Sequence, residues 1–242
     1  MENNHQEFNA FPDVYIDAIS ENPKKNFFTP VLDELLISIL KPEIVCDVGC
    51  GNGVFTIALK EKIGCQLLGV DGSEYAVAKA KSIGFDEVHL ISDFCSQRLP
   101  FDDDSMDLVI CKDVLEHLLD PDFLVKEIVR VTKPGGQCLL HVPNHFPVIG
   151  RIRFLFRNNI DTFNYFPESN RWNFPHIRFF NKNDLMLMAR KNGLLPEIDL
   201  SWHFFRPARI AKLIPLLAKW IGNRYTDQTS EGITILFKKF NG

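Results

Sequence analysis

Three glycines follow directly on a short apolar segment and precede a helical pattern. The run 45–53 (VCDVGCGNG) places Gly49, Gly51 and Gly53 at alternate positions, with Asp47 two residues before the first glycine. Glycine lets a backbone turn sharply and approach a ligand closely, and the start of a helix offers free N–H groups. The spacing GxGxG differs from the GxGxxG that is typical of nicotinamide dinucleotide sites. An acid before the loop would repel a pyrophosphate but could accept hydrogen bonds from an amino group.

Two more carboxylates stand just after the predicted strands that follow the glycine run. Asp71 ends the apolar segment 66–71, about 20 residues downstream of the glycines, where a carboxylate in this kind of sheet accepts the hydroxyls of a ribose. Asp93 follows the segment 86–91 and precedes Phe94. This pair suits an adenine, because the carboxylate accepts from the exocyclic amine while the aromatic ring packs on the base. The acids therefore favour a nucleoside ligand that carries an amino group.

The elements that must position these residues alternate along the chain. Short, non-alternating apolar segments predict buried strands at 43–48, 66–71, 86–91, 107–111 and 136–142. Helical spacing predicts helices at 31–40, 54–62, 73–82 and 121–131. This alternation indicates a parallel sheet covered by helices on both faces. It breaks at Pro143 and resumes with a helix at 183–192, a strand at 194–200, a helix-like stretch at 207–221 and a final strand at 232–237.

Five motifs occur in a fixed order along residues 40–145: DVGCGNG, the strand end at Asp71, SDF, FDDDSMDLVICKDVLEHLLDP and VTKPGGQCLLHVPN. As a set they resemble class I S-adenosylmethionine-dependent methyltransferases, especially the small-molecule type 11/type 23 branch. The resemblance implies an α/β fold, a Rossmann-like doubly wound seven-stranded sheet with its last strand antiparallel and helices on both faces. A weaker resemblance, carried by the run from Val142 and by the segment 171–180, is to bacterial methionine-biosynthesis proteins of the W type.

The resemblance also implies a cofactor and its ligands. The cofactor is S-adenosyl-L-methionine, which leaves as S-adenosyl-L-homocysteine. Its methionine part would lie on the glycine loop, its ribose on the acid after the second strand, and its adenine on the SDF motif. The implied cofactor residues are Asp47, Gly49, Gly51, Asn52, Gly53, Asp71, Gly72, Ser73, Asp93, Phe94 and Lys112. Lys112 is a departure, because the family usually has a small or polar residue beside the methionine part.

Residues for the methyl acceptor are expected after the fifth strand, since ligands bind outside the carboxyl ends of the strands in such sheets. Methyl transfer to oxygen benefits from a general base, usually histidine. His145 and His176 are the candidates for catalysis, and each could instead be a packed or exposed loop residue. His141 lies inside a strand and is expected to be a satisfied core histidine. Glu116 and His117 are expected to pack or cap, and no residue is assigned to a metal.

Charge divides the chain unevenly. The net charge is -4, but residues 1–144 hold 12 Lys/Arg against 24 Asp/Glu, and residues 145–242 hold 15 against 7. The segment 145–182 combines arginines with many aromatics, which is typical of a lid with its own apolar core and snorkelling arginines. A sharper hypothesis is an anionic, phosphate-bearing substrate bound by Asn144, Arg171 and Arg178. Nucleic acid is not expected as a partner, because the rest of the surface is acidic.

The remaining features exclude other classes. The N-terminal residues lack a signal peptide pattern, and no apolar stretch reaches the ~20 residues of a membrane span. The six cysteines form no CxxC pair, so buried free thiols in the cytoplasm are expected. The stretch 207–221 suits a lid or dimer helix better than a membrane anchor, which leaves a homodimer open. We expect one domain, with a core at 31–143 and 181–242 and lid segments at 1–30, 144–180 and 202–225.

These observations predict a cytoplasmic methyltransferase that modifies an oxygen of a small metabolite. An anionic or phosphate-bearing acceptor is favoured, such as a nucleotide-linked precursor of a surface glycan. Three alternatives stay open: a quinone-precursor O-methyltransferase, a non-catalytic methyltransferase-like partner protein in methionine or other small-molecule biosynthesis, and a nicotinamide-dependent oxidoreductase. The last is disfavoured by the GxGxG spacing and by Asp47.

Overall fold

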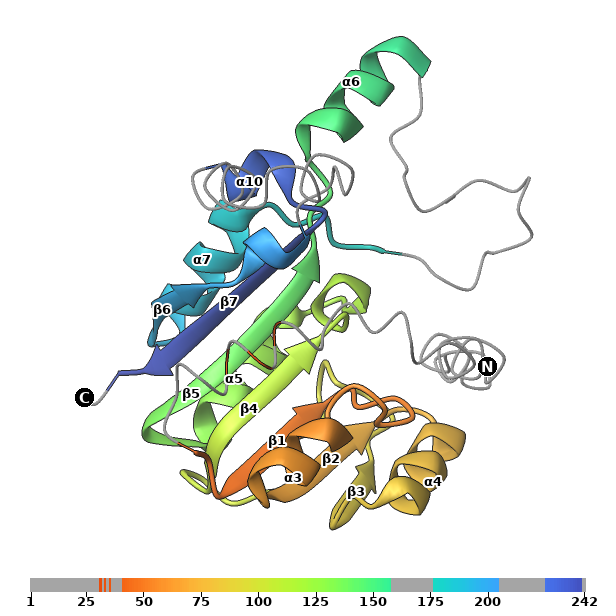
Figure 1. The fold of residues 1–242 in the computed structure, drawn as a ribbon, viewed down its shortest axis with the longest axis vertical. Helices are drawn as coiled ribbons and strands as arrows, with labels where there is room; N and C mark the ends of the chain where they lie inside the picture. Colours follow the sequence, from red (N-terminus) through yellow and green to blue (C-terminus); the bar gives the residue numbers. More distant parts are fainter. Residues whose placement is uncertain are drawn as a thin grey trace.

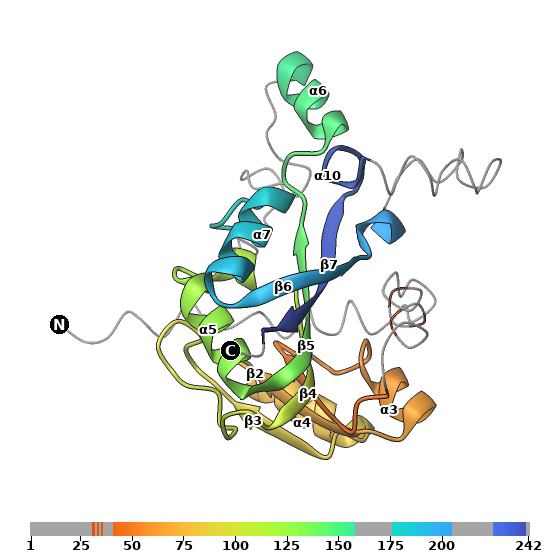
Figure 2. The same cartoon turned by 90° about the vertical axis from the view of Figure 1, so that its left-hand side faces the viewer.

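The described residues form one mixed β-sheet with helices on both faces (Figures 1 and 2). The computed structural model describes Val31, Asp33, Leu35 and residues 41–157, 176–204 and 225–240. Its strands are β1 (Ile44–Val48), β2 (Gln66–Asp71), β3 (Glu87–Leu90), β4 (Met106–Lys112), β5 (Thr132–Pro143), β6 (Leu194–Asp199) and β7 (Gly232–Lys239). Its α-helices are α3 (Ile57–Ile63), α4 (Glu74–Ile83), α5 (Pro121–Val131), α6 (Val148–Arg157), α7 (Lys182–Lys191) and α10 (Thr226–Thr229), with 3₁₀ turns η2 (Leu115–His117) and η4 (Ser201–Phe204).

The sheet has the order β3-β2-β1-β4-β5-β7-β6. The strands from β3 to β5 pair in parallel, whereas β7 lies antiparallel between β5 and β6. The order reverses between β1 and β4, so their carboxyl ends form the topological switch point where ligands bind in open α/β sheets. The predicted doubly wound sheet with an antiparallel final strand is confirmed.

Side chains of successive strand residues point to opposite faces, and each face has its own core. On β4, Val109 and Cys111 belong to the cluster that includes α5 and α7. Leu108 and Ile110 belong to the cluster that includes α3 and α4. Figure 2 shows the sheet nearly edge-on, with α5 and α7 on one side and α3 on the other. Burial on both faces explains why these strands read as continuous apolar runs.

The helix starts follow from their capping residues. Ser73 Oγ accepts the Ala76 N–H at 3.2 Å, so the predicted cap of α4 is confirmed. Asp120 caps α5, whose first residue is Pro121, a position where the missing N–H costs nothing. Asn181 caps α7 through a reciprocal capping box with Asp184.

The segment after β5 differs from the prediction. No regular period was expected between 144 and 180, yet Val148–Arg157 forms α6, which stands away from the sheet in both views (Figures 1 and 2). Two of its described apolar side chains are strongly exposed, Leu155 at 72% and Phe156 at 83%. The described part of this segment therefore has no apolar core of its own. The predicted helix-like stretch 207–221 and all of 158–175 lie outside the described residues.

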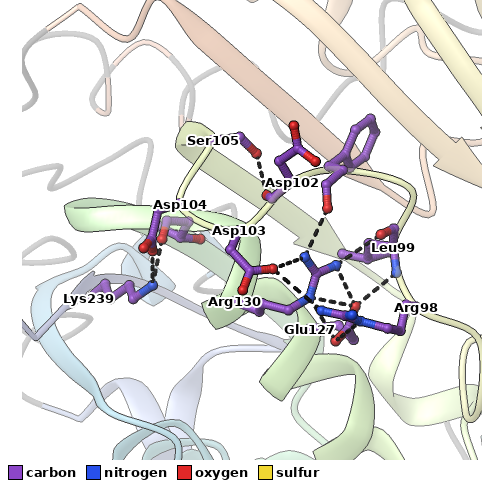
Figure 3. Close-up of polar contacts among 11 residues, drawn as sticks. Arg98, Leu99, Asp102, Asp103, Asp104, Ser105, Glu127, Arg130 and Lys239 are labelled. Atoms are coloured by element: carbon purple, nitrogen blue, oxygen red, sulfur yellow. Dashed lines mark hydrogen bonds and ion pairs between the residues drawn. The ribbon is translucent and has the colours of Figure 1, made fainter.

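An ion-pair network fixes the loop before β4, at the amino end of that strand (Figure 3). The Arg130 guanidinium donates to the carbonyls of Leu99 and Phe101, both at 2.9 Å, and to the carboxylates of Glu127 and Asp103. Glu127 is buried and also accepts the Leu99 N–H at 2.9 Å. The run 102–104 is exposed, as a solvated turn would be, but two of its acids are paired. Asp104 accepts from Lys239 at 2.6 Å.

Replacing Arg130 by alanine is expected to lower the free energy of unfolding by about 2–4 kcal/mol. The reason is that buried Glu127 would lose the guanidinium that donates to both of its oxygens, and among the described residues would keep only the exposed Arg98, at 3.6 Å, as a charged partner. Urea unfolding followed by circular dichroism measures the change. Lys126→Ala is the matched control: Lys126 lies on the same helix and pairs with Asp122 at 2.9 Å, but its side chain is 60% exposed. It should change stability by no more than about 0.5 kcal/mol. Equal losses in both variants would contradict the importance of burial.

No helix among the described residues is long and apolar enough to cross a membrane. All six cysteines are free, and five of them are buried, as the sequence predicts.

Candidate active site

The glycine loop lies between β1 and α3, at the switch point of the sheet. Gly49, Gly51 and Gly53 all have positive φ angles, of 73°, 54° and 77°. The N–H groups of Gly49 and Cys50 donate to the Val70 carbonyl at 2.8 and 3.0 Å, which ties the loop to the end of β2. Left-handed backbone at three alternate positions explains why only glycine suits them. Because the loop continues to Thr56, α3 begins at Ile57, three residues later than predicted.

Asp47 is a buried acid beneath this loop. Its Oδ2 accepts the Thr56 hydroxyl at 2.6 Å, and the residue is only 4% exposed. Burial raises the pKa of Asp47 to about 7, although the Thr56 hydrogen bond and the Lys112 charge oppose the rise. Loss of water around the carboxylate is the dominant cause. Near neutral pH this carboxyl therefore sits close to its own titration point.

Asp71 at the end of β2 holds the glycine loop directly. Its Oδ2 accepts the Gly51 N–H at 2.7 Å, and its Oδ1 accepts the Ser73 N–H at 2.9 Å. Burial raises the pKa of Asp71, and hydrogen bonds from Ser73, Gly51 and Gly72 oppose this effect. A carboxylate has about four lone-pair sites, so these three backbone bonds still leave capacity for a ligand hydroxyl. The predicted ribose acid and the glycine loop thus form one unit.

Three more of the predicted cofactor residues lie at the same carboxyl edge or on the loop. Asn52 is buried, and its Oδ1 accepts the Val54 N–H at 3.3 Å. Asp93 follows β3, where its carboxylate accepts from the Cys95 N–H and the Ser96 hydroxyl. Phe94 is half-buried against the core beside it. These contacts are compatible with either a turn acid or an adenine ligand.

Lys112 ends β4 and faces the loop from the other side of the switch point. Its Nζ lies 4.5 Å from the centre of the Phe55 ring and pairs with Asp113. Asp113 has a positive φ of 54° and stands 3.3 Å from His141 Nε2. Burial alone would raise the pKa of Asp113, but Lys112 and His141 lower it well below its usual range. The ammonium therefore brings a positive charge to the place predicted for the methionine part.

His141 is the satisfied core histidine that the sequence predicts. It is 5% exposed, and its Nδ1 lies 2.6 Å from the Thr234 hydroxyl on β7. Burial lowers the pKa of His141, against the attraction of Asp113. The ring therefore packs between β5 and β7.

The two histidines proposed for catalysis touch each other. His145 Nε2 lies 2.9 Å from His176 Nδ1, and the Phe180 N–H donates to His145 Nδ1 at 3.0 Å. Because Nδ1 of His145 accepts, its proton is on Nε2 and is donated to His176. Burial, together with the neighbouring His117 and His145, lowers the pKa of His176 to about 3. The structure thus assembles a neutral histidine pair at the carboxyl end of β5.

Two of the three residues predicted for substrate binding, Asn144 and Arg178, make hydrogen bonds within the protein. Asn144 is buried, donates to the Ser230 carbonyl at 2.8 Å and accepts the Phe146 N–H at 3.0 Å. The Arg178 guanidinium donates to the backbone carbonyls of Leu118 and Leu119. Arg171 lies outside the described residues.

Sequence reasoning missed two members of this region. Glu116 and His117, expected to pack or cap, lie with His176, and one potential ligand atom from each lies within 4.8 Å of the other two. Glu116 is fully buried, and neither of its carboxylate oxygens has a hydrogen-bond partner among the described residues. Burial raises the pKa of Glu116 well above its usual range. In the sequence, the only signal was the acid Glu116 between two leucines. Nothing in the spacing indicated that His176, 59 positions after His117, would lie beside it.

The strand order, the antiparallel β7 and the glycine loop after β1 together define the Rossmann-like fold of class I S-adenosylmethionine-dependent methyltransferases. Residues 46–140 match the family described as "Methyltransferase domain". The chain therefore contains a methyltransferase domain that runs from β1 into β5.

Curated relatives match the same part of the chain. The ubiquinone biosynthesis O-methyltransferase of Pseudomonas paraeruginosa is 30% identical over 114 residues, which is 45% of this chain and 47% of that protein. The protein of the same name from Pseudomonas fluorescens is 28% identical over 109 residues. The chain spans about half the length of the curated relatives it matches.

Solved structures share the fold over nearly the whole chain. A complex of the Haloferax volcanii Trm112 methyltransferase activator with a methyltransferase matches with a TM-score of 0.66 and 20% identity, over 98% of this chain and all of that one. An S-adenosylmethionine-dependent methyltransferase from Mesorhizobium loti matches with a TM-score of 0.59 and 19% identity, over 90% of this chain and all of that one. At these identities the likeness establishes the fold alone.

The methyl donor that this domain implies is S-adenosyl-L-methionine, and the described residues fit it. A Cβ at Gly51 would meet nothing within 4 Å, so the space above the loop backbone is open to a ligand. Asp71 keeps acceptor capacity beside that space. Asp47 and Lys112 flank the loop with charges suited to an amino group and a carboxylate.

Proposed function

We propose that this chain transfers the methyl group of S-adenosyl-L-methionine to an oxygen of a small molecule. The observation that carries the proposal is the hydrogen bond from the Gly51 N–H to Asp71 Oδ2 at 2.7 Å. It joins the glycine loop and the ribose acid into one preformed surface at the switch point of the sheet. The match of residues 46–140 to the methyltransferase domain supports the same assignment.

Each cofactor residue has a role that follows from its chemistry. Asp71 accepts the ribose hydroxyls, and Asp93 with Phe94 receives the adenine. Asp47 accepts from the amino group of the methionine part, and Lys112 attracts its carboxylate. When bound, the cofactor supplies a methyl group on a sulfonium that is already activated for transfer. The protein's main contribution is then to orient donor and acceptor in line.

Methyl transfer to a hydroxyl also requires removal of the hydroxyl proton. We propose that the pair of His145 and His176 accepts it. The pair lies after β5, on the edge where acceptors bind in such sheets. In its neutral arrangement both Nδ1 atoms accept hydrogen bonds, from Phe180 N–H and from His145. Taking up the hydroxyl proton therefore requires one of these two bonds to open. His145 is the better base, because burial and its neighbours depress the pKa of His176.

An anionic acceptor is the favoured substrate class. The basic excess of residues 145–242 supports it, together with the donors of Arg178 and Arg171. Two carbonyls use part of the Arg178 guanidinium, which has five donors in all. A quinone precursor is the second candidate, favoured by the similarity to ubiquinone biosynthesis O-methyltransferases. Methyl transfer to phosphorylated sugars and to phenolic quinone precursors, measured side by side with labelled donor, separates the two.

Binding of S-adenosyl-L-homocysteine tests the proposal before any acceptor is known. Calorimetric titration should give saturable binding and a higher melting temperature. No binding would contradict both the cofactor assignment and the enzyme activity. Binding without transfer to any acceptor class would instead favour a non-catalytic methyltransferase-like partner protein.

Replacing Asp71 by alanine is expected to weaken S-adenosyl-L-homocysteine binding by about 1–3 kcal/mol, the worth of a charged hydrogen-bond pair. Calorimetric titration of the wild type and the variant measures the difference. Asp71→Asn is the matched comparison, because its amide oxygen can still accept from one of Gly51 and Ser73 while the charge is lost. Unchanged affinity in both variants would refute the ribose assignment.

A further inference from the structure

Glu116, His117 and His176 form a compact cluster on the acceptor side of the sheet. Glu116 and His117 belong to η2 after β4, and His176 precedes α7. One carboxylate oxygen and one ring nitrogen from each histidine lie within 4.8 Å of one another. Glu116 and His176 are buried, and His117 is partly buried.

The carboxylate of Glu116 is the unusual member of this cluster. Its side chain is 0% exposed, and neither oxygen has a hydrogen-bond partner among the described residues. The nearest ring atom, His117 Nε2, is 3.8 Å from Oε1, which is too far for a hydrogen bond. A buried carboxylate without partners is costly, and such groups in native proteins are usually paired or coordinate metals.

The main chain holds the three side chains together. The N–H groups of Ile177 and Arg178 both donate to the Glu116 carbonyl, at 2.9 and 3.0 Å. His176 is thereby fixed against the turn that carries Glu116 and His117. The ring centres of His117 and His176 are 4.9 Å apart. The backbone hydrogen bonds therefore keep these three residues next to each other.

We propose that Glu116, His117 and His176 bind a divalent transition-metal ion, with Zn²⁺ as the reference ion. Two imidazoles and one carboxylate are a ligand set for zinc and related ions, and three protein ligands leave a further position for a water or a substrate oxygen. Ligand atoms around one tetrahedral zinc lie about 3.4 Å apart, so small side-chain rotations close the 4.8 Å cluster onto an ion.

His145 is a neighbour of this site and a competitor for one of its ligands. A neutral imidazole has a single lone pair, and that of His176 accepts the proton of His145. If His176 coordinates an ion through this lone pair, it can no longer accept the His145 proton. The hydrogen bond is then broken, or its direction is reversed. His145 is left next to the ion with an altered proton position, which couples metal binding to the proposed base.

The use of the ion in catalysis rests on the proposed function. An acceptor hydroxyl bound at the open position would lose its proton to His145 or to water, because a metal lowers the pKa of bound oxygen. The oxygen then forms the O–CH₃ bond as the C–S bond breaks, and the electron pair stays on sulfur to give S-adenosyl-L-homocysteine. Metal binding itself needs neither cofactor nor acceptor.

Titration of the full chain with Zn²⁺ after removal of metals by a chelator tests the proposal. We expect saturable binding of one ion per chain, and a visible absorption band when Co²⁺ replaces Zn²⁺. His176→Ala, His117→Asn and Glu116→Gln should each weaken binding by roughly 100-fold or more, since even supporting residues of metal sites cost 10- to 100-fold. Zn²⁺ should also raise the melting temperature of the wild type and not of these variants.

His89→Asn is the matched control, because His89 also stands beside a glutamate, 2.6 Å from Glu87, but on β3. It should bind Zn²⁺ as the wild type does. No saturable binding by the wild type, or equal binding by His176→Ala and His117→Asn, would overturn the site. If Glu116→Gln does not fold, the two histidine variants decide. S-adenosyl-L-homocysteine titrations run in parallel, so a failed cofactor assignment and a failed metal site give different results.

Discussion

Replacing Gly49 by alanine is expected to lower the free energy of unfolding by about 2–5 kcal/mol. Its φ of +73° costs a residue with a Cβ about 1–2 kcal/mol. The new Cβ would also lie 2.2 Å from Val114 Cγ2, so the turn after β4 must move, which adds about 1–3 kcal/mol. Chemical denaturation measures the loss, and S-adenosyl-L-homocysteine titration should show weakened binding as well.

Two other glycines separate the causes. Gly64 has nearly the same φ, +71°, but nothing lies within 4 Å of its Cβ position. Gly64→Ala should therefore lower the free energy of unfolding only by the cost of the left-handed backbone, about 1–2 kcal/mol. Gly51 has a φ of +54° and equally open space, but that space belongs to the proposed ligand. Gly51→Ala should therefore resemble Gly64→Ala in stability and lose cofactor affinity. If Gly49→Ala were as stable as Gly64→Ala, the close approach to Val114 would be unimportant.

The sequence predicts the elements well where one local signal decides them. β2 has the predicted bounds 66–71, and α5 has the predicted bounds 121–131, because an apolar run and a capped proline start mark them. The fifth strand, predicted at 136–142, is longer in the structure: β5 begins at Thr132, and its pairing with β4 jumps from Met106–Thr132 to Leu108–Gln137. Strand pairing through such an irregularity depends on the neighbouring strand, which no local pattern reveals.

The meeting of Asp47 and Asp71 was predictable, because both lie near the ends of neighbouring strands. Parallel strands bring their carboxyl ends to the same edge of the sheet. The meeting of His176 with Glu116 was not predictable, since it depends on main-chain hydrogen bonds between segments about 60 residues apart. The α6 helix was missed because the sequence between 144 and 180 shows no clean helical period.

Replacing Asp47 by asparagine is expected to stabilise the protein relative to the wild type as the pH rises. The folded protein holds the Asp47 proton up to about pH 7, whereas the unfolded chain releases it near pH 3.9. Between these values the folded state binds one proton more, so the wild-type free energy of unfolding falls with rising pH. The contribution of Asp47 is fully present below about pH 4 and is lost by about pH 8.

The size of this effect follows from the two pKa values. A difference of about three units corresponds to about 4 kcal/mol, so the stability of Asp47→Asn minus that of the wild type should rise by about 3–4 kcal/mol between about pH 4.5 and pH 8. Asp86→Asn is the control with the opposite sign, because the hydrogen bond from Lys60 lowers the pKa of Asp86. The free energy of unfolding of Asp86→Asn minus that of the wild type should not change with pH above about pH 5.

The same titration should govern cofactor binding. An amino group that donates to Asp47 favours the carboxylate, so S-adenosyl-L-homocysteine should bind more tightly as the pH rises toward about 7 and should release a proton on binding below it. Calorimetry in two buffers of different ionisation enthalpy counts that proton. The Asp47→Asn variant should bind more weakly, with no proton release from this position. If the free energies of unfolding of the wild type and of Asp47→Asn change in parallel from about pH 5 to pH 8, Asp47 is ionised throughout this range. The prediction of a neutral buried acid beneath the glycine loop would then be wrong.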